Sequence, residues 1–262
     1  MAWNDNQHRR FKYCKERQTM KSKLSVWTAM LMVPAALTWA GDKSTASDET
    51  TKILEKVDAA AKAVKAVKYD VVAKASGGGQ GFELKGRYIF TGLEGSEPKK
   101  FLVEIEVKAL GSSETRKYTG GSDGENYFVI DHADKKAYVD IDPAVMGNRF
   151  RGAYRAGLMI EFVHDHPFSD EIKAASKTMK GTKTVGGVEC YEIDIAYAAA
   201  GGQKATWCFS KKDFLPRKRV DASPRGNTEK TITNLVVDPK IDDATFKFKL
   251  PEGYTQVDDF AP

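Results

Sequence analysis

The chain has 262 residues, with 41 Lys and Arg against 36 Asp and Glu, 41% hydrophobic residues and three cysteines. This composition is typical of a globular protein and excludes a disordered tail, a collagen and a multi-span membrane protein. The net charge of +5 lies entirely in residues 1–40, which hold seven basic and two acidic side chains. Residues 41–262 are therefore neutral overall, which argues against nucleic acid as the main partner.

Residues 1–40 have the pattern of an export signal. Two lysines precede an uncharged, mostly apolar run of 17 residues from Leu24 to Ala40, and polar residues follow it at once. This order matches the basic, apolar and small-residue regions of a secretory signal peptide, with cleavage expected near Ala40. We therefore predict a periplasmic protein with a single mature domain, residues 41–262. An uncleaved inner-membrane anchor is the alternative, although 17 residues are few for a membrane span.

An amphipathic helix is predicted from Ser47 to about Val67, because apolar residues recur there at steps of three and four and Ser47 suits a helix cap. The strands that follow alternate between apolar and polar residues, which is typical of an antiparallel sheet. They are expected at residues 69–75, 82–90, 101–110, 116–119, 126–131 and 136–140. Two short helices are then predicted from Pro143 to about Ser176, broken near residues 164–167. Strands resume at residues 178–183, 188–197, 204–209, 216–221, 230–237 and 245–250.

Two cysteines lie in neighbouring predicted strands. Cys190 and Cys208 form an even pair in a chain expected to be exported, where disulfides persist. If the two strands form a hairpin centred on Ala199, Cys190 lies opposite Cys208 and Tyr191 lies opposite Trp207. We therefore predict a disulfide across this hairpin, and two reduced cysteines are the alternative.

Several motifs occur in an order that is similar to the LolA/LppX-like superfamily, and especially to its periplasmic members of the outer-membrane lipoprotein-sorting type. They are SDGENYFVIDHADKKAYVDIDP at 122–143, VGGVECYEIDIAY at 185–197, TWCFSKKDFLPRKRV at 206–220 and IDDATFKFKLPEGY at 241–254. The resemblance implies a mainly antiparallel β fold: an incomplete half-barrel of about 11 strands, with an N-terminal helix and a helical lid over an apolar concave face. Members of this superfamily carry lipoproteins or other lipids between membranes.

The expected function is a carrier or binder of lipid or lipoprotein acyl chains, acting as a monomer, with a membrane protein as donor or acceptor. The alternative is a non-transporting interaction module of the same fold, in which the apolar face is a filled core. The residues expected to line a cavity are apolar or aromatic and lie on the predicted strands or lid: Tyr88, Phe90, Val103, Ile105, Leu158, Phe162, Tyr191, Ile193, Trp207, Phe246 and Phe248.

Catalytic patterns are weak in this sequence. His164 and His166 flank an aspartate before a proline, but no HExxH motif accompanies them. The sequence has no G-x-S-x-G motif, and its paired aspartates lie where turns are expected. We therefore predict that the protein is not an enzyme and has no cofactor or metal. The basic residues from Lys211 to Arg219 are interpreted as a solvated strand face, with an anionic lipid surface as the alternative.

Overall fold

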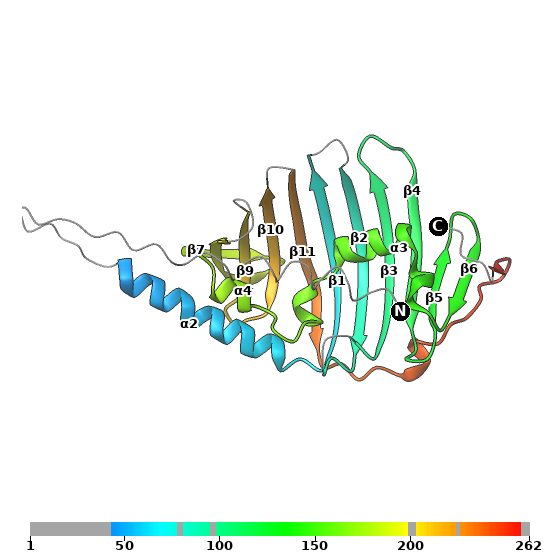
Figure 1. The fold of residues 1–262 in the computed structure, drawn as a ribbon, viewed down its shortest axis with the longest axis horizontal. Helices are drawn as coiled ribbons and strands as arrows, with labels where there is room; N and C mark the ends of the chain where they lie inside the picture. The colour runs from blue at the N-terminus through cyan, green and yellow to red at the C-terminus, as the bar shows by residue number, and fades with distance from the viewer. Residues whose placement is uncertain (1–42, 78–80, 95–97, 199–202, 224–225, 258–262) are drawn as a thin grey trace, which may run out of the picture. The chain divides into compact units, whose positions relative to one another are not determined.

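The computed structural model describes residues 43–77, 81–94, 98–198, 203–223 and 226–257 (Figure 1). These residues belong to one compact unit, Gly41–Pro262. The predicted export signal lies outside the described residues. Within the described ranges, no helix combines the length and the apolar character that a membrane crossing requires.

The described strands form one twelve-stranded sheet that consists of two antiparallel meanders. β1 to β6 follow one another on one side, β11 to β7 follow one another on the other, and β1 pairs with β11 between them. The strands are β1 (Ala66–Ser76), β2 (Phe82–Thr91), β3 (Lys100–Ala109), β4 (Thr115–Ser122), β5 (Tyr127–Asp131), β6 (Lys136–Asp140), β7 (Ser176–Val185), β8 (Val188–Ala196), β9 (Lys204–Ser210), β10 (Pro216–Ser223), β11 (Gly226–Val237) and β12 (Thr255–Val257). Among them β7 and β12 lie at the two ends, so the sheet is open, as predicted for a half-barrel.

The helical elements lie mainly in two parts of the chain. They are α2 (Lys43–Lys62), then η2 (Pro143–Met146), α3 (Asn148–Gly157), η3 (Ile160–Phe162) and α4 (Ser169–Ile172), and later η4 (Asp243–Thr245). We call residues 143–172 the cover, because α3 packs on β1, β2 and β3 and the ribbon of the cover crosses that face of the sheet (Figure 1). The sheet face under the cover is the inner face. α2 packs beside β7 and α4.

The observed elements agree with most of the predicted ones and differ at two places. α2 begins at Lys43 rather than Ser47 and ends at Lys62, and Val67 belongs to β1. The predicted strand at 245–250 is wrong. Apolar and polar residues alternate there because two side chains are buried outside the sheet. Phe246, at the end of η4, is fully buried, and the ring of Phe248 packs against that of Phe128 with 5.5 Å between their centroids. The short β12 pairs instead, in parallel, with β6.

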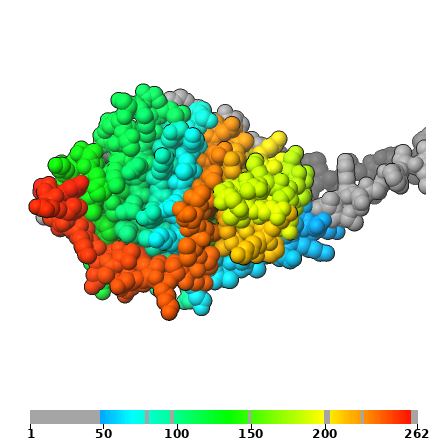
Figure 2. Space-filling model, turned by 180° about the vertical axis from the view of Figure 1, so that it is seen from behind, coloured from blue at the N-terminus to red at the C-terminus, as the bar shows by residue number. Residues whose placement is uncertain are grey.

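The sheet buries apolar side chains on both faces. The main core lies between the inner face, the cover and α2, and it includes Leu54, Tyr69, Phe90, Phe150 and Trp207. A second cluster on the outer face of β5 and β6 is closed by Phe248 and Tyr254 from the C-terminal segment. Figure 2, seen from behind, shows this segment in orange to red along one edge of the outer face. The C-terminal segment therefore stabilises the outer face rather than the core beneath the cover.

Candidate functional site

The C-terminal end of α3 is held by side chains from the sheet. The last carbonyl groups of a helix have no partner within it, and a cation near them is favourable. Lys230 Nζ of β11 donates to the carbonyl oxygens of Leu158 at 2.9 Å and Arg155 at 3.4 Å. The Tyr88 hydroxyl of β2 donates to the Tyr154 carbonyl oxygen at 2.9 Å. Sheet side chains thus complete the hydrogen bonding of the helix end.

A second tyrosine binds the main chain just beyond α3. The Met159 amide donates to the Tyr69 hydroxyl of β1 at 3.1 Å, in a fully buried contact. The rings of Tyr69 and Tyr88 stack with their centroids 5.2 Å apart, and Phe162 of the cover lies 5.8 Å from Tyr69. Burial raises the pKa of both tyrosines, so their hydroxyls stay neutral and available for these hydrogen bonds. The inner face under the cover is therefore aromatic, with polar groups aimed at the cover's backbone.

A pocket of about 600 Å³ lies beside the end of the cover, between η3, α4 and strands β8 to β10. It is lined by Ile160, Glu161, His164, His166, Pro167, Ser169, Asp170, Glu171, Lys173, Ala174, Tyr197, Ala198, Gln203 and Arg219. Glu161 is 4% exposed, and its Oε1 accepts a hydrogen bond from Arg219 Nη1 at 2.6 Å. Its Oε2 is buried and has no hydrogen-bond partner among the described residues. Burial raises the pKa of Glu161, although Arg219 opposes the shift.

Arg219 is fixed from three sides. Its Nε donates to Asp221 Oδ1 at 2.8 Å, and its guanidinium lies 4.7 Å from the centre of the Trp207 ring. Burial alone lowers the pKa of Arg219, but Glu161 and Asp221 outweigh burial and raise it. Tyr197, which also lines the pocket, donates to Glu171 Oε1 at 2.6 Å. The pocket thus has a polar, preorganised floor.

The structure brings most of the predicted cavity residues together. Tyr88, Phe90, Val103, Ile105, Leu158, Phe162, Ile193 and Trp207 lie in the main core, with Tyr191 partly buried against it. Phe246 is fully buried. Phe248 lies apart, in the outer cluster. These placements show which residues share the inner face; whether that face admits a ligand stays a prediction.

Sequence reasoning missed the polar residues of the inner face. Tyr69, Glu161 and Lys230 were not singled out by any motif, and Arg219 was assigned to a solvated strand face. That assignment is wrong for Arg219, because it stacks on Trp207 of the inner face, and Arg217 is also buried. One signal was present in the sequence: Arg219 lies opposite Trp207 once the β9–β10 hairpin is paired.

The cysteine hairpin has a different register from the predicted one. Cys190 pairs with Ser210, and Glu192 pairs with Cys208, because the hairpin closes where the Tyr197 amide bonds to the Gln203 carbonyl. The register is therefore centred one residue later in the chain, which moves Cys208 two places along. Both cysteines are buried free thiols in a small cluster of their own, so the predicted disulfide is not confirmed. Burial raises the pKa of Cys208 to about 11.

The structure does not bring His164 and His166 together with a third described histidine. His164 and His166 are exposed at the pocket, where the His166 amide bonds to His164 Nδ1. His132 lies on the outer face between Thr119 and Tyr254. Within the described ranges, no group of three or more His, Cys, Asp and Glu side chains is arranged to hold a metal ion.

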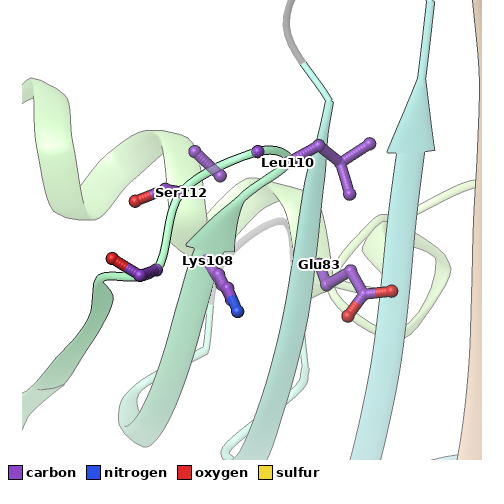
Figure 3. A pocket seen from close by; sticks show the side chains of 7 residues that line it. Glu83, Lys108, Leu110 and Ser112 are labelled. Atoms are coloured by element: carbon purple, nitrogen blue, oxygen red, sulfur yellow. The ribbon is translucent and has the colours of Figure 1, made fainter.

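A second hollow of about 530 Å³ lies at the turn after β3 (Figure 3). It is lined by Glu83, Lys108 and residues 109–113, and Glu83 forms an ion pair with Lys74 at 3.0 Å. Leu110 in this turn is 54% exposed. The ion pair of Glu83 is itself solvent-exposed, so this hollow is less suited to ligand binding than the pocket at Glu161.

No protein-family profile and no characterised protein match the sequence. Among solved structures, LprF from Mycobacterium bovis is 11% identical, covers 80% of this chain and 99% of its own, and has a TM-score of 0.49. The lipoprotein LppX from Mycobacterium tuberculosis is 9% identical, with 74% and 98% covered and a TM-score of 0.46. A LolA superfamily protein from Nitrosomonas europaea is also 9% identical, with 76% and 97% covered and a TM-score of 0.30. The likeness concerns the fold.

Proposed function

We propose that this protein binds an acyl chain of a lipid or lipoprotein between its inner face and its cover, and that the cover moves aside to admit the chain. The observation that carries the proposal is the set of hydrogen bonds that joins Tyr69, Tyr88 and Lys230 to the backbone of the cover. These residues project from three neighbouring strands of the inner face, β1, β2 and β11. The binding is non-catalytic.

These hydrogen bonds suit a cover that opens and closes again in one position. A helix that is permanently docked could be held by apolar contacts alone, without hydrogen bonds from the sheet. A buried hydroxyl costs free energy unless it is paired, so the two tyrosines favour the closed position of the backbone they bind. Each hydrogen bond contributes about 1 kcal/mol net, which is small enough for several to break together.

The sequence provides independent support. Its motif order resembles a superfamily whose members carry lipoproteins or other lipids, and its first forty residues have the pattern of an export signal. The proposal therefore includes a periplasmic location for residues 41–262, action as a monomer, and membrane proteins as donor and acceptor of the cargo.

A different observation favours the interaction module. Nine of the eleven residues predicted to line a cavity are less than 9% exposed, and most of these pack in one core with the cover closed. In that case the inner face is occupied by its own side chains, and a partner protein contacts another surface.

Native mass spectrometry of residues 41–262, exported to a periplasm, tests the two functions. Lipid that copurifies at about one molecule per chain, or uptake of a fluorescent fatty acid by the delipidated protein, would support the carrier. A matched pair of variants sharpens the test: Tyr88→Phe loosens the cover, while Tyr254→Phe removes a hydrogen bond on the outer face. Faster uptake by the first variant alone is expected. A lipid-free protein that takes up no fatty acid in either variant would refute the carrier function.

A further inference from the structure

The pocket at Glu161 contains an incomplete hydrogen-bonding arrangement. Glu161 is almost fully buried, with one carboxylate oxygen bound to Arg219 and the other without a partner among the described residues. Buried polar atoms in native proteins are nearly always paired, because leaving one unpaired costs free energy. Glu161 lines the pocket, but its Oε2 has almost no accessible surface, so a partner that enters from solvent reaches Oε2 only after a side chain of the lining moves.

The charges around Glu161 indicate that this group is a cation. The pocket is lined by three acidic residues, Glu161, Asp170 and Glu171, and by two basic ones, Lys173 and Arg219. Arg219 already donates to Glu161 and also to Asp221, which lies outside the lining. Lys173 and Asp170 are both solvent-exposed, which leaves Glu161 and Glu171 against Arg219 in the floor of the pocket. The buried floor therefore has more acceptors than donors.

The surroundings favour an organic cation over a metal ion. Ile160 on the pocket wall is 52% exposed, and Pro167, Ala174 and Ala198 continue this apolar wall. An aliphatic chain can pack there, whereas it contributes nothing to a hydrated metal ion. A volume of about 600 Å³ is also in the range of small-molecule sites.

From this arrangement we infer that the pocket binds a primary ammonium group on a short aliphatic chain. The ammonium group donates to Glu161 Oε2 and to Glu171, and the aliphatic part packs against Ile160. The ammonium can belong to a free alkylamine or to the ethanolamine headgroup of a lipid, because the recognised chemistry is the same. This site does not rest on the proposed acyl-chain function, but Ile160, Glu161 and Glu171 belong to the cover, so the pocket is complete only while the cover is closed.

Isothermal titration of residues 41–262 with pentylamine tests the inference, with 1-pentanol and pentanoate as matched ligands. Pentylamine is expected to bind at least tenfold more tightly than either. Glu161→Gln should weaken pentylamine binding at least tenfold, while Glu189→Gln, a control for an exposed ion pair with Lys211, should leave it unchanged. If 1-pentanol binds as tightly as pentylamine, the inference is wrong.

Two further variants keep the test decisive if Glu161→Gln does not fold. Glu171→Gln removes the second carboxylate, and Ala198→Trp places a bulky ring in the pocket from an exposed lining position. Both should abolish binding, and unchanged binding in both would overturn the inference. Competition then identifies the source of the amine. Displacement of pentylamine by lysophosphatidylethanolamine, but not by lysophosphatidylglycerol, assigns a lipid headgroup, and displacement by neither assigns a free amine. Failure of fatty-acid uptake would leave this result untouched.

Discussion

Removal of the Tyr88 hydroxyl tests whether the cover opens as a separate unit. In Tyr88→Phe the ring keeps its stacking on Tyr69, while the hydroxyl's hydrogen bonding to the backbone of α3, chiefly to the Tyr154 carbonyl, is lost. That carbonyl still accepts a hydrogen bond from the Leu158 amide at 3.0 Å, so it is not left unpaired. The cost should therefore be about 1 kcal/mol, near the ordinary net value of one hydrogen bond. This corresponds to about a fivefold increase in the open population.

Hydrogen exchange of individual backbone amides measures this effect. The Met159 amide donates to the Tyr69 hydroxyl of the sheet, so its exchange reports opening of the cover, whereas the Leu158 amide bonds to the Tyr154 carbonyl within the cover and does not. In the unmodified protein we expect the Met159 amide to exchange with a lower free energy, and a weaker dependence on denaturant, than the amides of β1 to β3. In Tyr88→Phe it should exchange about fivefold faster. Fatty-acid uptake should accelerate by a similar factor if opening limits it.

Tyr254→Phe is the control, because it removes a hydrogen bond to His132 on the outer face. It should lower the global free energy of unfolding without increasing sub-global opening of the cover or fatty-acid uptake. The reasoning would be refuted if the Met159 amide exchanged with the same free energy and the same denaturant dependence as the central strands. The cover would then open only when the whole domain unfolds.

Three other predictions concern single sites. Because burial raises the pKa of Glu161, folding takes up a proton when the pH lies between the ordinary carboxyl pKa and the raised one. The free energy of unfolding, measured by urea titration, should therefore fall as the pH rises through this window. Glu161→Gln should flatten this slope, whereas Glu252→Gln, at an exposed position, should not. A Cβ at Gly120 would overlap the Phe150 ring, so Gly120→Ala should destabilise the domain by about 1–3 kcal/mol. Gly152 lies on α3 with open space around it, so Gly152→Ala should stabilise the domain by about 0.5–1 kcal/mol. With the pKa of Cys208 at about 11, its alkylation at pH 8 in the folded protein should be about a hundredfold slower than in the unfolded chain. Equal rates would contradict a buried thiol, and a cysteine that is labelled only after reductant is added would contradict a free one.

The sequence predicted the sheet well because period-two alternation is a direct consequence of strand geometry. Every predicted strand before residue 240 is present, and the antiparallel pairing follows from the one-sided apolar pattern. Alternation failed at 245–250, where Phe246 and Phe248 are buried without sheet pairing. It also could not fix the register of the cysteine hairpin, because a shift of two residues keeps every side chain on the same face.

The candidate site was harder to predict, because its polar residues have no sequence pattern of their own. Arg219 lies in a run of basic residues, and only its pairing with Trp207 shows that it points inward. Tyr69 and Lys230 read as ordinary strand residues, since their partners are backbone atoms of the cover, 72 to 90 residues distant. Contacts of this kind depend on the path of the cover over the sheet, which local sequence does not specify.

The filled core and the carrier function are compatible, because the cover itself occupies the space that an acyl chain would take. The aromatic residues under α3 are core when the cover is closed and would be a binding surface when it is open. Each methylene of an acyl chain contributes about 0.8 kcal/mol on burial, so ten contribute about 8 kcal/mol. A chain of this length can displace the cover only if opening costs less than that. The exchange free energy of the Met159 amide therefore decides between the carrier and the interaction module: a value well below 8 kcal/mol permits the carrier, and a value above it leaves the inner face as a permanent core.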